Sequence, residues 1–269
     1  MKIHNKTAFI LSYIITFLAA ITAGGGLLMK ELYRDNAFVK TAWFINDIIT
    51  LFVVVPLMII AIYLSQKGSS KWFLILLGLL GYVFYNFAFY LFGATFNIFF
   101  LIYAALFSLS AFSLVLFLSQ SSLNTIALNF SEKIPVKWIS GYLFLIAFML
   151  FMVESSMIIP FLTSNIVPET IKLTGTNTSI VFALDFSIVM PVSIIAAFLL
   201  WKRCSWGFVM GIMMLVKGFT YGLVLSIGTV LLANSDAYGK WDPLMPLYVA
   251  LVIGGLLGCW LLLKNYRKI

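Results

Sequence analysis

Three ionisable side chains lie inside long apolar runs of the sequence. Glu154 lies in the run MVESS, Asp185 in ALDFS and Lys217 in LVKGF. A charged side chain at the centre of a lipid bilayer costs on the order of 3 kcal/mol by insertion scales, so each one is a candidate for binding or proton transfer. A fourth acid, Asp47, lies near the edge of its apolar run, where we expect it to touch lipid headgroups.

An acid and a base at similar depth in a membrane can compensate each other. A nearby carboxylate keeps a buried lysine charged, so we predict that Lys217 pairs with Asp185, with Glu154 or with both. The alternative is an ion pair that only holds helices together, because desolvation offsets much of the attraction in such a pair. Three charges with polar neighbours favour a substrate or ion site over this structural role.

A stripe of aromatic and polar side chains follows one helix face of the run 72–93. Tyr82, Tyr85 and Asn86 are spaced i, i+3, i+4, and Tyr90 continues the stripe. This lining suits a small, partly apolar or cationic organic ligand, since tyrosine rings attract cations through their faces. The alternative is that the tyrosine hydroxyls link helices by hydrogen bonds.

Several cofactor chemistries lack the residues that they need. His4 is the single histidine, which leaves no bis-histidine haem site, no zinc site of the His-Glu-x-x-His type and no Ser–His relay. Cys204 and Cys259 form no Cys-x-x-Cys pattern, and no Walker motif is present. We therefore expect no cofactor, no metal site and no disulfide, and we disfavour an enzyme.

The composition places these side chains in a membrane. Of the 269 residues, 63% are hydrophobic and 10% are charged, whereas a soluble domain carries roughly 25% charged residues. This balance excludes a soluble enzyme, a nucleic-acid-binding module and a disordered chain. The net charge of +8 comes from basic residues between apolar blocks, so it indicates membrane topology and not nucleic acid.

The apolar blocks predict an all-α polytopic membrane protein. A spanning helix needs about 20 mostly apolar residues. The blocks long enough to span lie at about 8–29, 44–65, 72–93, 97–119, 138–162, 178–201, 206–233 and 243–263. The remaining connections are too short for a soluble domain. A cleaved signal peptide is an alternative for the first block, but the internal repeat described below favours a retained helix.

The distribution of Lys and Arg predicts the orientation. Eleven of the 17 basic residues fall on the side of both termini, five fall on the opposite side, and Lys217 lies within a span. The positive-inside rule then places both termini in the cytoplasm, and we expect the protein in the cell membrane.

The two halves of the chain resemble each other, which predicts an internal repeat of 1–120 and 137–269. The run VPLMIIAIYL beginning at Val55 aligns with MPVSIIAAFL beginning at Met190 at one constant offset. Further on, LIYAAL resembles PLYVAL, which pairs Tyr103 with Tyr248. Four spans per half is an even number, so the repeat is parallel, with its axis along the membrane normal. The alternative is chance similarity between apolar helices.

The repeat also relates the candidate site residues of the two halves. At the offset of the first alignment, Tyr82, Tyr85 and Asn86 meet Lys217, Thr220 and Tyr221, and Thr50 meets Asp185. We therefore expect equivalent helices to turn equivalent polar faces toward one shared central cavity.

Prolines and glycines mark candidate hinges and close contacts. Pro56 and Pro191 lie at matched places inside two helices, where each removes a backbone hydrogen bond and favours a kink or hinge. Gly-x-x-x-Gly spacings in the run 206–233 favour close helix packing. The run Gly24–Gly26 is interpreted as a flexible helix end.

These features favour a small-solute transporter, of the secondary, ion- or proton-coupled type, with an intramembrane site open to the outside. Its partners would be the lipid bilayer and a small molecule or ion. The alternative is a membrane-embedded sensor or an accessory subunit, with a membrane-protein partner or a homo-oligomer. A third hypothesis is an enzyme acting on lipid through two carboxylates, which a separate placement of Glu154 and Asp185 would eliminate. A Schiff base at Lys217 has no other support in the chain.

Overall fold

The chain is an all-helical polytopic membrane protein. The computed structural model describes residues 5–119, 129–235 and 239–266, and eight helical segments in this part are long and apolar enough to cross a membrane. Lys2, His4, Arg267 and Lys268 lie outside the described residues. The spans are α1 (Lys6–Leu28), α2–η1–α3 (Ala37–Gln66), α4 (Ser70–Gly93), α5 (Phe100–Leu118), α7 (Val136–Ser164), α9–η2–α10 (Ile180–Trp201), α11 (Ser205–Ala233) and α12 (Met245–Lys264).

The predicted number of spans is confirmed, with one clear difference in bounds. The second span begins at Ala37, about two turns before the apolar run that predicts it. Asn36 starts the helix early because its side chain accepts a hydrogen bond from the Val39 backbone N–H at 3.0 Å. The extra turns are amphipathic, so hydropathy alone does not reveal them.

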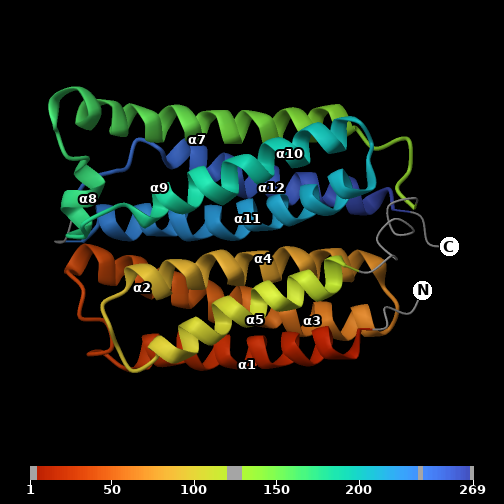
Figure 1. Ribbon diagram of the computed structural model, residues 1–269, viewed down its shortest axis with the longest axis horizontal. Coiled ribbons are helices and arrows are strands. Elements are labelled where there is room, and N and C mark those ends of the chain that lie inside the picture. The colour runs from red at the N-terminus through yellow and green to blue at the C-terminus, as the bar shows by residue number, and fades with distance from the viewer. Residues whose placement is uncertain (1–4, 120–128, 236–238, 267–269) are drawn as a thin grey trace.

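The spans form two bundles that lie side by side (Figure 1). One bundle contains α1 to α5 and the other contains α7 to α12, and the start of α1 and the end of α12 lie at the same end of the molecule. The bundles meet mainly along α4 and α11. At Gly78 the helices are so close that a Cβ atom there would lie 2.6 Å from the Val216 Cβ. A side chain at this position would push the bundles apart.

The first bundle is closed into a ring. Its first helix, α1, packs against both the second span and α5, which is the last helix of the bundle. The Ser12 and Ser113 hydroxyl oxygens lie 3.3 Å apart across the contact between α1 and α5, and the Phe9 and Phe117 ring centroids are separated by 5.1 Å. This seam leaves no gap between the first and last helices at these positions.

The second bundle is open on one side. Helices α7, α10, α11 and α12 pack in that order, but α7 and α12 have few contacts with each other. Tyr142 of α7 bridges them, since its hydroxyl lies 3.2 Å from the Ala250 carbonyl oxygen and 3.3 Å from that of Leu251. The Tyr142 ring rests on Gly254, where a Cβ atom would overlap it.

The second span of each bundle contains a π-helical turn just before its proline. These turns are η1 (Thr50–Val54), between α2 (Ala37–Ile49) and α3 (Val55–Gln66), and η2 (Asp185–Val189), between α9 (Ile180–Leu184) and α10 (Met190–Trp201). The Val55 N–H donates to the Thr50 carbonyl and the Met190 N–H to the Asp185 carbonyl. Pro56 and Pro191 follow in the first turn of a regular helix, where the missing N–H is tolerated. Single π-turns inside α-helices are frequent at functional sites.

Gly24–Gly26 lie in the last two turns of α1, at the helix end that the sequence predicts. All three residues belong to the regular helix α1. A Cβ atom at Gly26 would overlap the Asp47 carboxylate, and one at Gly25 would overlap the Phe99 ring. Because Gly25 and Gly26 have no side chains, the Phe99 ring and the Asp47 carboxylate can approach the backbone of α1 closely.

Candidate functional site

The three buried ionisable side chains converge in the second bundle. Lys217 of α11 has its Nζ atom 3.9 Å from the Asp185 Oδ1 atom. The exposed fractions of Lys217 and Asp185 are 8% and 3%. The ammonium also lies over two aromatic faces, 4.0 Å from the Tyr85 ring centroid and 4.6 Å from that of Tyr221. The expected pairing of Lys217 with Asp185 is therefore present, supported by cation–π contacts.

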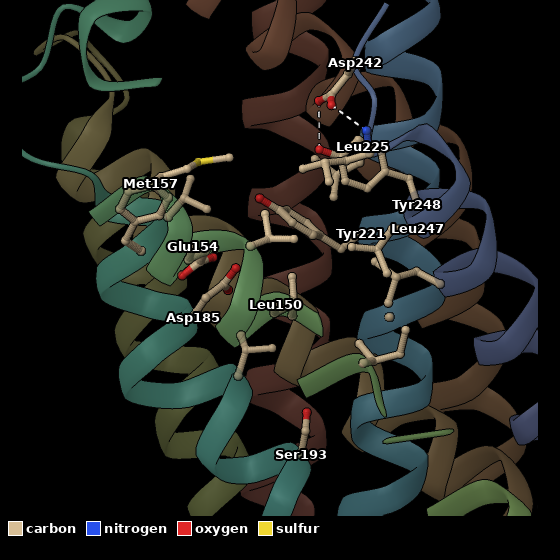
Figure 2. A pocket seen from close by; sticks show the side chains of 18 of the residues that line it. Leu150, Glu154, Met157, Asp185, Ser193, Tyr221, Leu225, Asp242, Leu247 and Tyr248 are labelled. Carbon is tan, nitrogen blue, oxygen red and sulfur yellow. Dashed lines mark hydrogen bonds between the residues drawn. The ribbon is translucent and has the colours of Figure 1, made fainter. Parts of the chain in front are cut away.

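Glu154 of α7 completes the charged group from the opposite side. Its carboxyl group faces that of Asp185 (Figure 2). Glu154 is 4% exposed, and its Oε2 atom has no hydrogen-bond partner among the described residues. The two acids do not face separate sides, so the condition that would eliminate a carboxylate enzyme is not met. Two carboxyl groups and one ammonium group thus share one buried location.

Asp185 also connects the two bundles. It is the first residue of η2, and its Oδ1 atom accepts a 2.8 Å hydrogen bond from the Tyr85 hydroxyl of α4. Tyr85 in turn stacks edge-on against Tyr221, with a distance of 5.2 Å between ring centroids. The position of the Asp185 carboxylate therefore depends on contacts from both bundles.

The charged group forms part of the wall of a cavity of about 530 Å³ inside the second bundle. This volume falls within the range of about 300–1,000 Å³ typical of small-molecule sites. Its walls come from α7, α9, η2, α10, α11, α12 and the short helix α8 (Glu169–Thr174). Ser193 lies at one end of the cavity and Asp242 at the other (Figure 2). Asp242 is fixed there by hydrogen bonds of 2.8 Å from the Leu244 N–H and 2.9 Å from the Tyr248 hydroxyl.

The cavity includes only part of the predicted site. Five of the predicted residues line it: Glu154, Asp185, Lys217, Tyr221 and Tyr248. The others are buried between packed helices and do not line it: Tyr82, Tyr85, Asn86, Tyr103 and Thr220. The tyrosines of this predicted stripe contact protein and not an open space: Tyr82 bonds to Thr50, Tyr85 to Asp185 and Tyr90 to Asp47.

A second, smaller cavity of about 280 Å³ lies between the bundles. Residues from α2, α4, α8, α9 and α11 line it, and Tyr221 and Tyr248 belong to its walls as well. This cavity is the closest counterpart of the expected shared central cavity, but Tyr82, Tyr85 and Asn86 do not line it. The charged group lies on the wall of the larger cavity.

The buried polar residues outside the cavity make distinct contacts. Tyr82 and Thr50 are joined by a 3.0 Å hydrogen bond between their hydroxyl oxygens. Thr220 donates to backbone carbonyls of its own helix. Asn86 is fully buried, and neither atom of its amide group has a hydrogen-bond partner among the described residues. Tyr103 stacks near Tyr90, with 5.2 Å between ring centroids.

Asp47 differs most from its expected environment. Its exposed fraction is 3%, so it does not lie at the headgroups. Its carboxylate accepts hydrogen bonds of 2.6 Å from the Tyr33 hydroxyl and 2.8 Å from that of Tyr90. Burial, and then the charge of Asp47, raise the pKa of Tyr33 above its usual range, so this phenol remains a donor.

Sequence reasoning missed the Asp47 cluster because its parts are far apart in the chain. Tyr33 belongs to a loop that precedes the span, Tyr90 comes from α4, and Gly26 of α1 leaves space for the carboxylate. The Tyr90 position at the end of the aromatic stripe is the one signal that pointed toward this region.

No family model, curated protein or solved structure matches this chain.

Proposed function

We propose that this protein is a secondary transporter of a small organic solute, coupled to a proton or another cation. One observation carries the proposal: Glu154, Asp185 and Lys217 converge on the wall of a cavity of ligand size within a membrane-spanning bundle. Ionisable groups at membrane depth are costly and typically mark substrate or ion pathways. A purely structural ion pair needs no cavity beside it.

The two facing carboxyl groups provide a place for a coupled proton. Like charges in direct contact cannot both ionise readily, so the Glu154–Asp185 pair holds one proton while Asp185 remains paired with Lys217. A second proton on Asp185 removes its negative charge and releases the Lys217 ammonium. The charge on the cavity wall then changes with each proton bound, which links substrate affinity to protonation.

An internal parallel repeat provides the corresponding movement. The Thr50–Tyr82 hydrogen bond and the Asp185–Lys217 ion pair occupy positions that the sequence alignment relates, which supports the repeat. The matched π-turns before Pro56 and Pro191 support it as well. In this proposal the bundles rock against each other along α4 and α11 and give alternating access to the cavity.

The proposed location is the cell membrane, with both termini in the cytoplasm. The distribution of basic side chains supports this orientation. The Asp242 end of the cavity, which lies away from the chain ends, then faces the outside (Figures 1 and 2).

Proton movement in proteoliposomes tests the proposal. Liposomes containing a trapped pH-sensitive dye would be offered tetramethylammonium, choline and tetraphenylphosphonium in turn. We expect at least one of these cations to drive proton movement, and we expect Asp185→Asn and Lys217→Met to abolish the signal. Glu132→Gln, at an exposed loop carboxylate, is the matched control and retains it. Signals that are unchanged in the Asp185 and Lys217 variants would refute this function.

A further inference from the structure

We propose that the ligand of the large cavity is an amphiphilic organic cation, and that it enters from the lipid side between α7 and α12. This inference rests on the proposed function, since it names the substrate class of the same site. Three independent features carry it: the charge of the cavity wall, its apolar surface and the open seam of the second bundle.

The charge of the wall favours a cation. Four carboxyl groups line the cavity, those of Glu154, Glu169, Asp185 and Asp242, against the single ammonium group of Lys217, so the wall stays net negative even with one proton on the Glu154–Asp185 pair. Lys217 is already paired with Asp185. The Glu154 carboxyl group also lies on the cavity wall, and its Oε2 atom has no hydrogen-bond partner among the described residues. An anionic ligand would meet uncompensated repulsion from the remaining acids.

Most of the remaining wall is aliphatic. The side chains Leu150, Val153 and Met157 come from α7, and Leu247 and Leu251 come from α12. Burial of apolar area on these walls would stabilise a ligand with a hydrophobic body. Aromatic rings add a second attraction for positive charge, because Tyr221 and Tyr248 also line the cavity. The wall thus matches a molecule that combines one cationic centre with apolar substituents.

The seam between α7 and α12 provides the route. The equivalent seam of the first bundle, between α1 and α5, is closed by packing and by the Ser12–Ser113 contact. In the second bundle α7 and α12 have few contacts, and Tyr142, which also lines the cavity, bridges them at Ala250. Leu150 of α7 and Leu247 of α12 lie on opposite sides of the cavity (Figure 2).

The surroundings of this seam are lipid. The outer face of α7 carries large exposed apolar side chains, among them Phe144, Phe148 and Phe151. An opening between two spans leads to the bilayer, into which amphiphilic cations partition because their apolar groups are buried there, whereas hydrophilic cations do not. A ligand of the proposed class can therefore reach Glu154 and Asp185 without crossing an aqueous vestibule.

Binding of matched probes tests the ligand class. The full chain in lipid nanodiscs would be titrated with tetraphenylphosphonium, with tetraphenylborate, which has the same shape and the opposite charge, and with choline. We expect tetraphenylphosphonium to bind best, and Glu154→Gln to weaken its binding by about tenfold or more. Glu132→Gln leaves binding unchanged. Equal binding of tetraphenylborate, or full affinity in Glu154→Gln, would overturn the assignment.

A cross-link across the seam tests the route. Leu150→Cys and Leu247→Cys, in a background with Cys204→Ser and Cys259→Ser, would be joined with a short bifunctional thiol reagent. Relative to the same cysteine pair before cross-linking, we expect association and dissociation of tetraphenylphosphonium both to slow by about tenfold, since a gate acts on both rates. The control is the Ser12→Cys and Ser113→Cys pair, which closes a seam that is already closed.

Unchanged rates in the cross-linked protein would overturn the lateral route. Specific binding of tetraphenylphosphonium without any coupled proton movement in proteoliposomes would refute transport while leaving the ligand class and the route intact. The two proposals therefore fail in different experiments.

Discussion

The Tyr85 hydroxyl donates a 2.8 Å hydrogen bond to Asp185 across the contact between the two bundles. This bond joins α4 of the first bundle to the π-turn of the second, at the level of the buried charges. The Tyr85 ring also supports the Lys217 ammonium, whose Nζ atom lies 4.0 Å from the ring centroid. One tyrosine thus connects the packing of the bundles to the electrostatics of the cavity wall.

Removal of this hydroxyl tests the connection. Tyr85→Phe keeps the ring and its cation–π contact but leaves the buried carboxylate with one donor fewer. We expect the free energy of unfolding in detergent to fall by about 1.5–3 kcal/mol, the range for hydrogen bonds to charged groups. Tyr13→Phe, which removes an exposed hydrogen bond to Gln66, is the control with little effect. Equal losses of unfolding free energy in the two variants would show that the bond between the bundles contributes no more to stability than an exposed hydrogen bond.

The charged group should behave as a coupled unit in a double-mutant cycle. Lys217→Met leaves two buried acids without a base, and Asp185→Asn leaves the ammonium without its paired carboxylate. Each single change is expected to cost about 3–5 kcal/mol of unfolding free energy, because it leaves a buried charge uncompensated. The double variant should cost clearly less than the sum of the single variants. Additive losses, measured by unfolding in detergent, would mean that the two side chains do not interact.

The spans and the charge pairing could be predicted because they follow from local composition and from one energetic rule. Apolar blocks of spanning length become helices in a membrane, and an isolated charge at membrane depth requires a partner. Lys217 illustrates this, since the acids that act on it at comparable depth are Asp185 and Glu154.

The place of the cavity and the burial of Asp47 could not be predicted in the same way. Both depend on how whole helices approach one another. The separation of α7 from α12 determines where the cavity lies. The position of Tyr33 over the second span determines the burial of Asp47. No local pattern of residue types encodes either distance. The polar stripe of α4 predicts a shared cavity, but its tyrosines are enclosed by protein, with hydrogen bonds to Thr50, Asp47 and Asp185.

The Asp47 cluster predicts contrasting effects for two neighbouring glycines. A methyl group at Gly26 would overlap the Asp47 carboxylate, whereas nothing lies within 4 Å of a Cβ atom at Gly24. We expect Gly26→Ala to cost about 1–3 kcal/mol, as overpacking does. Gly24→Ala should stabilise the helix by about 0.5–1 kcal/mol, since alanine loses less conformational entropy than glycine. Thermal unfolding in detergent measures both, and a stable Gly26→Ala variant would contradict the close approach.

The π-turn of the second bundle predicts a functional effect of its proline. With Pro191→Ala, residue 191 gains an N–H group that can donate to the carbonyl four residues earlier, which favours a regular α-helix in place of η2. Conversion of the π-turn to a regular α-helical turn rotates the preceding segment about the helix axis. Asp185 then moves away from Lys217 and Tyr85. We therefore expect weaker tetraphenylphosphonium binding and loss of coupled proton movement in a protein that remains folded. Pro56→Ala makes the matched change in η1, away from the charged group, and should affect binding less. Equal effects of the two variants on binding would mean that the π-turn at Asp185 does not set the geometry of the site.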